Sequence, residues 1–329
     1  MKGKSGIAGI RVRAVVLAAG YGRRLEPLTR TVPKPLFPVV GRTLLARSLA
    51  RLAAVGCEAA AINLHHLGDQ IRRAIGPRFA RMALTYSEEP TILGTLGALY
   101  PLRDFLAPAD LILILNSDTL CAWPLQALIE HHRDSGFRAT LLLAARPNPD
   151  DFGGGVGIDG SGSVITLAGA NAPGSPRPVR QLVFAGAQVL EPTLLSRVLP
   201  GVSDSIHNLH APLLAEGGRL GSLVTSRRWH DMGTPRRFIE GVLEAARSGW
   251  TSRRAHVGPE VQIRACVVEH EAEVGRGARL ARSVVLPGAR LGEGAIAEDA
   301  LIGFGAVVEA QGRVVREMIA SDGSRTPLG

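Results

Sequence analysis

The chain has little that points to a membrane, a disulfide framework or a metal cluster. Its apolar runs fall short of the roughly 18 residues that span a bilayer, and the basic residues before Arg13 are not followed by the apolar stretch of a signal peptide. The three cysteines, Cys57, Cys121 and Cys266, lie far apart without metal-ligand spacing, which favours buried free thiols. These absences predict a cytoplasmic protein that does not act at a membrane.

Aromatic residues are also scarce, at 4% of the 329 residues, although the chain carries a formal net charge of +9. Nucleic-acid-binding surfaces gather basic side chains together and often interleave them with aromatic ones. Here the basic residues are mostly Arg and are spread along the chain. We therefore expect no nucleic-acid partner and interpret the charge as a compositional bias towards Arg, which would also suit an anionic small substrate.

Apolar runs alternate with amphipathic stretches between Val12 and about Ala145. The run Leu111–Leu115 is apolar throughout, which is typical of a central strand buried on both faces. This alternation predicts right-handed crossovers and an α/β fold with a Rossmann-like, mainly parallel sheet flanked by helices. Ligands of such sheets bind beyond the carboxyl ends of the strands. Further strands are predicted at 12–18, 59–64, 82–86, 138–144, 182–190 and 219–225, and helices at 44–55, 67–75, 95–99, 124–134, 204–216 and 235–247. Between them, the stretch 151–178 is rich in Gly, Ser, Pro and Ala, and we expect it to form an excursion that covers the site.

From Val257 onwards, apolar residues recur at six-residue steps with occasional steps of five. Gly follows several of them, as in Val274-Gly275 and Leu291-Gly292. The period fits a parallel β-helix of about three coils rather than an array of β-hairpins. The predicted domains are therefore 1–250 and 251–329. A stack this short buries little surface by itself, so we expect it to pack on the first domain or on another subunit of a homo-oligomer.

The most specific motif follows the first predicted strand and reads LAAGYGRRLEPLTRTVPKPL, from Leu17 to Leu36. At Gly20 and Gly22 the absence of side chains allows backbone N–H groups to approach phosphate oxygens. Arg24 and Lys34 supply two cations that would meet the charge of a triphosphate. The glycine spacing matches neither a dinucleotide fingerprint nor a Walker A loop, so the whole string carries the prediction.

Two acidic residues stand near further predicted turns. Asp118 follows the apolar run at 111–115, where a carboxylate is costly to bury unless it is paired or bound to a metal ion. Asp231 lies in the string WHDMGTP just before a predicted helix, where it could also serve as the helix N-cap. Two carboxylates and a triphosphate are typical of a Mg²⁺ site. His65 and His66, by contrast, are adjacent and lack a nearby third ligand, so we interpret them as a solvated pair.

The string at 17–36, Asn116-Ser117-Asp118 and WHDMGTPRRF at 229–238 together resemble the sugar-1-phosphate nucleotidyltransferases over nearly the whole chain. Members of that family convert a sugar 1-phosphate and a nucleoside triphosphate into a nucleotide sugar and pyrophosphate. The resemblance implies the nucleotidyltransferase fold with a C-terminal left-handed parallel β-helix, as some members have. It also implies a Mg²⁺-dependent enzyme in which the sugar phosphate attacks the α-phosphorus in line, without a covalent intermediate.

The resemblance assigns roles to individual residues. Arg24, Lys34 and Asp118 would be catalytic, with the two cations facing the leaving pyrophosphate, and Asp118 and Asp231 would hold Mg²⁺. The implied nucleotide-binding residues are Leu17, Ala18, Ala19, Gly20, Gly22, Gly94, Thr95 and Asn116, and the implied sugar-phosphate-binding residues are Gly155, Phe184 and Gly186.

Weaker likenesses indicate the substrates. Ile92–Leu99 is similar to the base-facing turn of mannose-1-phosphate guanylyltransferases, and Asn63-Leu64-His65-His66 is similar to a stretch in guanylyl and heptose-phosphate members. The C-terminal repeat also favours the guanylyl branch, so we expect GTP and mannose 1-phosphate. The alternatives are a uridylyltransferase acting on an N-acetylamino-sugar or glucose 1-phosphate, a heptose-1-phosphate guanylyltransferase, and a regulatory subunit that binds nucleotide sugar without turnover.

The chain departs from the family at one position. Many members carry Glu-Lys-Pro after the strand that matches 164–167, and that Lys meets the sugar phosphate. Here the matching stretch is Leu167-Ala168-Gly169-Ala170-Asn171, and no Lys follows Lys34 in the chain. Arg177 or Arg180 could replace it, or the metal alone could hold the sugar phosphate. Asn171-Ala172-Pro173-Gly174 resembles uridylyltransferases of cell-wall recycling that also lack the Lys.

Overall fold

The computed structural model describes residues 9–146 and 155–328, which form two compact units. One unit contains the chain up to Gly20 and Leu45–Trp229, and the other contains Tyr21–Leu44 and the chain from His230 onwards. The polypeptide therefore passes from the first unit into the second within the glycine-rich motif. The domain boundary at residue 250 stays a prediction, and residues 151–154 of the expected excursion lie outside the described ranges.

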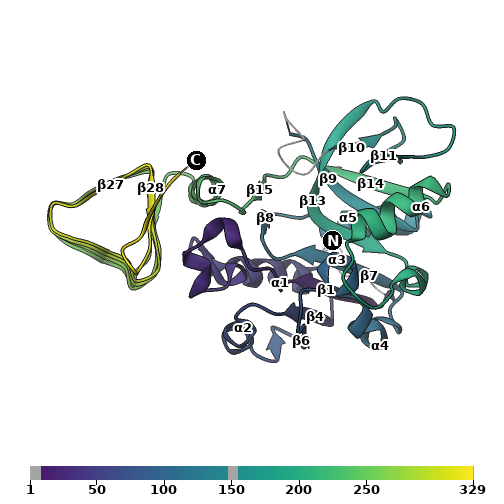
Figure 1. Ribbon diagram of the computed structural model, residues 1–329, viewed down its shortest axis with the longest axis horizontal. Coiled ribbons are helices and arrows are strands. Elements are labelled where there is room, and N and C mark those ends of the chain that lie inside the picture. Colours follow the sequence, from purple (N-terminus) through teal and green to yellow (C-terminus); the bar gives the residue numbers. More distant parts are fainter. Residues whose placement is uncertain (1–8, 147–154, 329) are drawn as a thin grey trace, which may run out of the picture. The chain divides into compact units, whose positions relative to one another are not determined.

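The described part of the first unit is built on an eleven-stranded sheet (Figure 1). The strands are β1 (Val12–Leu17), β4 (Ala59–Leu64), β5 (Arg78–Phe79), β6 (Met82–Glu88), β7 (Leu111–Asn116), β9 (Ala139–Ala144), β10 (Val156–Ile158), β11 (Val164–Leu167), β12 (Ala170–Asn171), β13 (Arg180–Leu190) and β14 (Leu220–Thr225). At its centre, β7, β1, β4 and β6 are parallel neighbours, in that order. Strand β13 pairs with β7 in the antiparallel sense, and β9 joins β13 to β14. The predicted α/β fold with a mainly parallel central sheet is confirmed.

Helices connect these strands. They are α1 (Leu44–Ala54), α2 (Gly68–Ile75), α3 (Gly94–Gly97), α4 (Arg103–Leu106), α5 (Leu125–Ser135) and α6 (Ala211–Ala215), with 3₁₀ turns at Tyr100–Leu102 and Pro192–Arg197. The helix predicted at 204–216 is instead a π-helical turn at Ile206–His210 followed by α6. Pro212 explains the interruption, because it has no N–H to donate to the carbonyl four residues earlier. Within the described residues, no helix is long and apolar enough to cross a bilayer.

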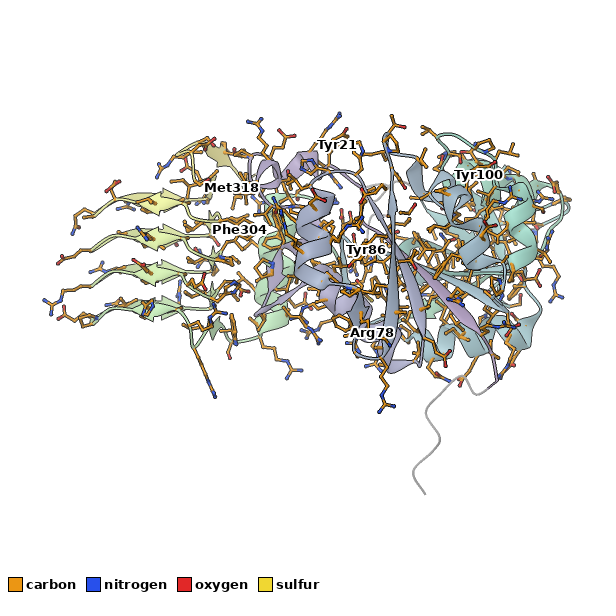
Figure 2. All side chains as sticks on the ribbon, turned by 90° about the horizontal axis from the view of Figure 1, so that it is seen from below. Tyr21, Arg78, Tyr86, Tyr100, Phe304 and Met318 are labelled. Atoms are coloured by element: carbon orange, nitrogen blue, oxygen red, sulfur yellow. The ribbon has the colours of Figure 1, made fainter. Side chains whose placement is uncertain are left out.

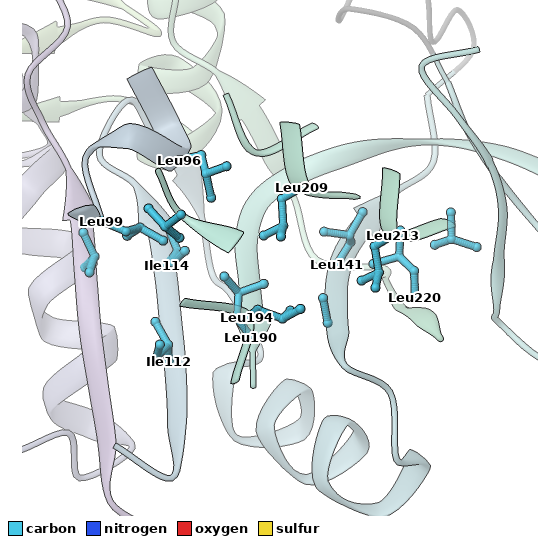
Figure 3. Close-up of a cluster of buried hydrophobic side chains, with 14 of the residues drawn as sticks. Leu96, Leu99, Ile112, Ile114, Leu141, Leu190, Leu194, Leu209, Leu213 and Leu220 are labelled. Atoms are coloured by element: carbon cyan, nitrogen blue, oxygen red, sulfur yellow. The ribbon is translucent and has the colours of Figure 1, made fainter. Parts of the chain in front are cut away.

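The core of the first unit lies between the central strands of the sheet and the helical segments that pack on them. Figure 3 shows Leu96 and Leu99 beside Ile112 and Ile114 of β7, all of them buried. The same cluster continues through Leu141 of β9 and Leu190 of β13 to Leu209, Leu213 and Leu220. The turn around α3 and the π-helical turn are therefore anchored in one core.

The second unit contains a parallel β-helix whose strands repeat every 17 residues, so that Val267 pairs with Val284 and Val284 with Leu301. Figure 1 shows its triangular outline and Figure 2 its stacked strands. One face contains β16 (Trp250–Thr251), β19 (Val267–Val268), β22 (Val284–Val285), β25 (Leu301–Ile302), β28 (Glu317–Ile319) and the antiparallel β29 (Arg325–Pro327). The second contains β17 (His256–Val257), β20 (Glu273–Val274), β23 (Arg290–Leu291) and β26 (Val307–Val308), and the third β18 (Gln262–Arg264), β21 (Arg279–Ala281), β24 (Ile296–Glu298) and β27 (Arg313–Val315). Two steps of six and one of five make one coil of this stack, and the parallel pairing excludes the hairpin array.

The repeated glycines of the β-helix lie where successive coils approach. A Cβ on Gly275 would come within 2.8 Å of the backbone at Gly292 and Glu293 in the next coil. Corners of the coils take left-handed backbone, for example at Gly277 (φ 65°) and Gly294 (φ 65°). The first coil is less buried than the next: Val257 and Ile263 of the first coil are 42% and 37% exposed, whereas Val274 and Leu280 in the next coil are buried. These two residues belong to the terminal coil, which has a neighbouring coil on one side.

The rest of the second unit contains Tyr21–Leu44 and the helix α7 (Pro235–Ala246). The first segment forms 3₁₀ turns at Arg23–Leu25, Leu28–Arg30 and Lys34–Leu36, followed by β2 (Pro38–Val39) and β3 (Arg42–Thr43). Phe37 packs edge-to-face on Phe238 of α7 and on Phe304 of the β-helix, at 5.6 and 5.0 Å between ring centroids. Helix α7 is capped by Thr234, whose hydroxyl accepts the Arg237 N–H at 3.3 Å.

Candidate active site

The parallel register of the central strands aligns their carboxyl ends. Leu17 of β1 is the register partner of both Asn63 of β4 and Asn116 of β7. The turns that follow these strands therefore lie at the same edge of the sheet, which is where open α/β sheets bind their ligands. Ala18, Ala19 and Gly20 follow β1 at this edge, where the first two are buried and Gly20 is exposed.

Ser117 ties the turn that contains Asp118 to the end of β1. Its backbone N–H and its hydroxyl both donate to the Leu17 carbonyl, at 3.1 and 2.6 Å. Asp118 and Asn116 are partly exposed on either side of this buried serine. Two predicted parts of the site, the phosphate loop and the acidic turn, are thus held together in the first unit by Ser117, which the prediction left without a role.

Gly186 lies next to the same turn. It lies within β13 at an irregularity in the pairing with β9, and its φ of 77° is left-handed. A Cβ there would meet the Thr119 hydroxyl at 2.8 Å and the Asn116 Cβ at 3.4 Å, which explains the glycine. The structure therefore brings a predicted sugar-facing glycine to a predicted nucleotide residue. Phe184, two positions earlier, packs partly buried against the core.

Gly155 lies apart from that contact, just before β10. A Cβ on it would come within 2.5 Å of the Gln181 Oε1 of β13. At the position where the family resemblance implies a sugar-phosphate lysine, the structure has a tight turn between β11 and β12, in which Ala168 (φ 49°) and Gly169 (φ 81°) are both left-handed. Positive φ at both central residues is typical of a two-residue hairpin turn, which favours Asn, Asp and Gly.

The predicted base-facing turn around α3 is fixed by a segment far along the chain. Leu96 and Gly97 donate their N–H groups to the Ser203 carbonyl at 3.0 and 3.2 Å, and Ser203 donates to the Leu93 carbonyl at 2.9 Å. The Thr95 hydroxyl accepts the Ser205 N–H at 2.8 Å. Sequence reasoning missed this clamp, because no local pattern relates residues about 110 positions apart.

The clamp gives a structural reason for the glycines in this turn. A Cβ on Gly94 would lie 2.4 Å from the Ser203 carbonyl, and one on Gly97 would lie 2.3 Å from the Gly201 carbonyl. Packing within the protein therefore accounts for both glycines, and the nucleotide-binding role of Gly94 and Thr95 stays a prediction.

In the second unit, Gly22 adopts left-handed backbone with a φ of 66°. A Cβ on it would lie 2.9 Å from Thr29 Cγ2 and 3.3 Å from the Lys34 Cβ, so only a glycine fits this turn. The Thr29 hydroxyl donates to the Gly22 carbonyl at 3.2 Å. Lys34 is 5% exposed, at the start of its 3₁₀ turn. Two of the predicted phosphate-binding residues are therefore packed side by side.

Asp231, the last residue of β15 (Trp229–Asp231), is paired with two arginines of its own unit. Its Oδ2 accepts from Arg237 at 2.6 Å and lies 3.9 Å from the Arg24 guanidinium. Gly233 makes this meeting possible, because a Cβ there would lie 2.3 Å from Arg24 and 2.8 Å from the Asp231 Oδ1. The alternative of Asp231 as the N-cap of α7 is wrong, because Thr234 fills that position.

The cysteines offer no nucleophile to this site. Cys121 is the last residue of β8 (Thr119–Cys121), the strand that follows Asp118. Burial raises the pKa of the Cys121 thiol to about 12 and that of the Cys57 thiol to about 11. Both thiols are therefore protonated at neutral pH. Among the described residues, no three His, Cys, Asp or Glu side chains gather as a metal-binding group. His65 instead lies with its Nδ1 2.7 Å from the Glu89 carbonyl.

Comparison with known proteins identifies the family of this chain. The model of the nucleotidyl transferase family matches residues 13–248. The mannose-1-phosphate guanylyltransferase catalytic subunit beta of Drosophila pseudoobscura pseudoobscura is 28% identical over 275 residues, which are 82% of this chain and 72% of that protein. The probable mannose-1-phosphate guanylyltransferase 2 of Arabidopsis thaliana is 27% identical over 288 residues, which are 83% of this chain and 76% of that protein.

Solved structures share the fold. HddC from Yersinia pseudotuberculosis superposes with a TM-score of 0.58 at 19% identity, over 70% of this chain and 98% of that chain. A putative glucose-1-phosphate thymidylyltransferase from Bacillus anthracis, in complex with a sucrose, superposes with a TM-score of 0.60 at 20% identity, over 71% of this chain and 95% of that chain. At these identities the likeness concerns the fold alone.

Proposed function

Because the chain belongs to the nucleotidyl transferase family, we propose that it transfers the guanylyl group of GTP to mannose 1-phosphate and releases pyrophosphate. The relatives that carry this activity in their names, at 28% and 27% identity over most of the chain, support the choice of substrates. The observation that carries the proposal is the pair of Ser117 hydrogen bonds to Leu17, which hold the acidic turn beside the loop proposed to bind phosphate.

The reaction needs positioning and charge stabilisation more than proton transfer. An ionised oxygen of the sugar phosphate forms a bond to the α-phosphorus, while the bond from that phosphorus to the bridging oxygen of the β-phosphate breaks. The electron pair leaves with pyrophosphate, and no covalent enzyme intermediate forms. In this proposal Arg24 and Lys34 neutralise the leaving pyrophosphate, and the backbone around Gly20 holds the triphosphate in line.

Asp118 and Asp231 are the proposed Mg²⁺ ligands. Carboxylate oxygens are the donors that Mg²⁺ prefers, and it completes its shell with phosphate oxygens and water. The surroundings of Asp231 fit this role, because Oδ2 accepts from Arg237 while Oδ1 lies over Gly233, where a side chain would fill the space. Bound there, Mg²⁺ would neutralise phosphate charge and orient the triphosphate.

The turn at Ala168-Gly169 supports a second acceptor class. This turn carries no cation at the position where the resemblance implies a sugar-phosphate lysine. The uridylyltransferases of amino-sugar phosphates that the chain resembles at 171–174 also lack that lysine. A pyrophosphate-release assay separates the candidates when GTP, UTP, CTP and dTTP are each combined with mannose, glucose, heptose and N-acetylamino-sugar 1-phosphates. Release that is fastest with GTP and mannose 1-phosphate supports the proposal, and release that is fastest with UTP assigns the alternative. Absence of release with every pair would leave a nucleotide-sugar-binding subunit.

A further inference from the structure

A buried polar chain connects the two loops that the proposed function gives to the nucleotide. Asn63 lies near the end of β4, and Glu89 follows β6, its parallel neighbour. Both residues are 3% exposed, although one is an amide and the other a carboxylic acid. Neither belongs to the predicted site, and each is costly to bury unless its polar atoms are matched.

Three hydrogen bonds run through these side chains. The Ala18 N–H, in the loop after β1, donates to Asn63 Oδ1 at 2.7 Å. Asn63 Nδ2 donates to Glu89 Oε1 at 2.8 Å, and the Leu93 N–H donates to Glu89 Oε2 at 2.9 Å. The chain of hydrogen bonds therefore starts in the loop proposed to bind phosphate and ends at Leu93, within the turn proposed to face the base.

The backbone of Glu89 is fixed as well. Its N–H donates to the Leu64 carbonyl at 2.8 Å, and its own carbonyl lies 2.7 Å from His65 Nδ1. The Asn63-Leu64-His65 stretch thus contacts Glu89 through three successive residues, which gives the histidine a positioning role instead of a metal-binding one.

The sheet does not need this network. Strands β4 and β6 are already paired in register from Ala59 with Ala83 to Leu64 with Glu88, and apolar side chains would fill the same positions without a desolvation cost. A fully matched buried network does add rigidity and a single geometry. Here the groups that gain a fixed geometry are the N–H groups of Ala18 and Leu93, each in a nucleotide loop.

We propose that Asn63 and Glu89 are positioning residues, which set the distance between the phosphate loop and the base-facing turn so that a nucleoside triphosphate meets both at once. This rests on the proposed function. Neither side chain touches the nucleotide, because both are buried and each of their oxygens already accepts a hydrogen bond. Their effect is on nucleotide binding and alignment, and the sugar-phosphate half of the site is independent of it.

The polarity of the chain supplies a sharp test. In Glu89→Gln, two amides meet, and one N–H must face another N–H whichever way the amides turn. In Asn63→Asp, two carboxylates meet and repel each other. In the double variant Asn63→Asp/Glu89→Gln the donor and acceptor are exchanged, and every hydrogen bond can form again. A matched control is Glu130→Gln on α5, where Gln126 donates to the same kind of carboxylate at 2.6 Å on an exposed surface.

The experiment measures kcat and KM for both substrates in the full-length protein and its four variants, with the substrate pair that the wild type uses best. We expect each single variant to raise KM for the nucleoside triphosphate at least tenfold while KM for the sugar 1-phosphate stays within twofold. The double variant should return to within threefold of the wild type, and Glu130→Gln should be unchanged.

Three outcomes overturn the inference: single variants within twofold of the wild type, equal losses for both substrates, or a double variant no better than the worse single one. A direct base contact by Glu89 would instead change the preferred nucleotide and would not be restored in the double variant. If the wild type releases no pyrophosphate with any pair, the proposed function fails. The same variants are then compared by calorimetric titration with GTP and Mg²⁺, where the pattern of losses and rescue is expected in Kd. A wild type that binds no nucleoside triphosphate overturns the inference too.

Discussion

Replacing Gly20 by Ala separates what the protein needs at this position from what a bound nucleotide needs. Gly20 is exposed, its backbone is outside the left-handed region, and a Cβ on it would meet no described atom within 4 Å. The folded protein therefore gives no reason for a glycine here. A triphosphate held by backbone N–H groups does, because a methyl group would occupy the space that the phosphate needs.

The expected effects of Gly20→Ala on fold stability and on nucleotide affinity have opposite signs. A Gly→Ala change at compatible backbone stabilises a fold by about 0.4–1 kcal/mol, since the unfolded chain loses freedom. Loss of one hydrogen bond to a charged phosphate costs about 1.5–3 kcal/mol, which is roughly a 10- to 150-fold rise in Kd. We expect Gly20→Ala to unfold at the same or a slightly higher urea concentration than the wild type and to bind the nucleoside triphosphate at least tenfold more weakly.

Two further variants make the comparison. Gly160→Ala, in the exposed turn between β10 and β11, also has open space and ordinary backbone, so its stability should be the same as or slightly higher than that of the wild type and its nucleotide binding should be unchanged. Gly22→Ala must adopt left-handed backbone and crowd Thr29, so it should lose stability by about 1–2 kcal/mol from the backbone alone. Urea unfolding and calorimetric titration with the nucleotide and Mg²⁺ measure both quantities. Gly20→Ala with a wild-type Kd would refute the reasoning, as would a loss of stability like that of Gly22→Ala.

Three other changes have defined outcomes. Asp118→Ala should lower kcat by at least roughly a hundredfold while the urea midpoint stays near that of the wild type, and near-normal Mg²⁺-dependent turnover would contradict the metal assignment. His210 is fully buried with Nε2 2.5 Å from Gln188 Oε1, and burial lowers its pKa to about 4. Because the unfolded chain takes up the proton first as the pH falls, the free energy of unfolding should fall by on the order of 3 kcal/mol between pH 6.5 and pH 4. The fall should be smaller in His210→Gln, and urea titrations that give parallel pH profiles for the two proteins would exclude this cause. Gly277→Ala, at a β-helix corner with a φ of 65° and open space around it, should cost about 1 kcal/mol of unfolding free energy, and a stability equal to that of the wild type would show that the corner tolerates a side chain.

Local patterns predicted the parts of the fold that depend on local physics. The apolar run at 111–115 became β7, and the six-residue repeat became coils of 17 residues, since both patterns record which side chains face the core. The interruption of the helix predicted at 204–216 was also encoded locally, by Pro212, although the pattern of apolar residues concealed it. Thr234 rather than Asp231 caps α7, because the residue directly before Pro235 is the one whose hydroxyl reaches the first turn.

The contacts that shape the candidate site were harder to predict, because they join residues far apart in the chain. The clamp of Ser203 on Leu96 and Gly97 joins segments more than 100 residues apart, and the Asn63–Glu89 bond spans 26 residues. In the sequence, a serine or a glutamate in a loop looks the same whether it is solvated or buried. The signal that could have identified Glu89 is its place directly after β6, a strand parallel to β4, because Asn63 lies near the end of β4.

The glycines of the site show why one residue type can carry different information. Gly94 and Gly97 leave room for the carbonyls of Ser203 and Gly201, and Gly233 leaves room for the Arg24 guanidinium. Substitution at any of these disturbs the protein before a ligand arrives, so a loss of activity there would not show a direct contact. Gly20 differs, because within the described residues no atom lies where its side chain would be. Its variant is therefore the direct measurement of whether the motif holds phosphate.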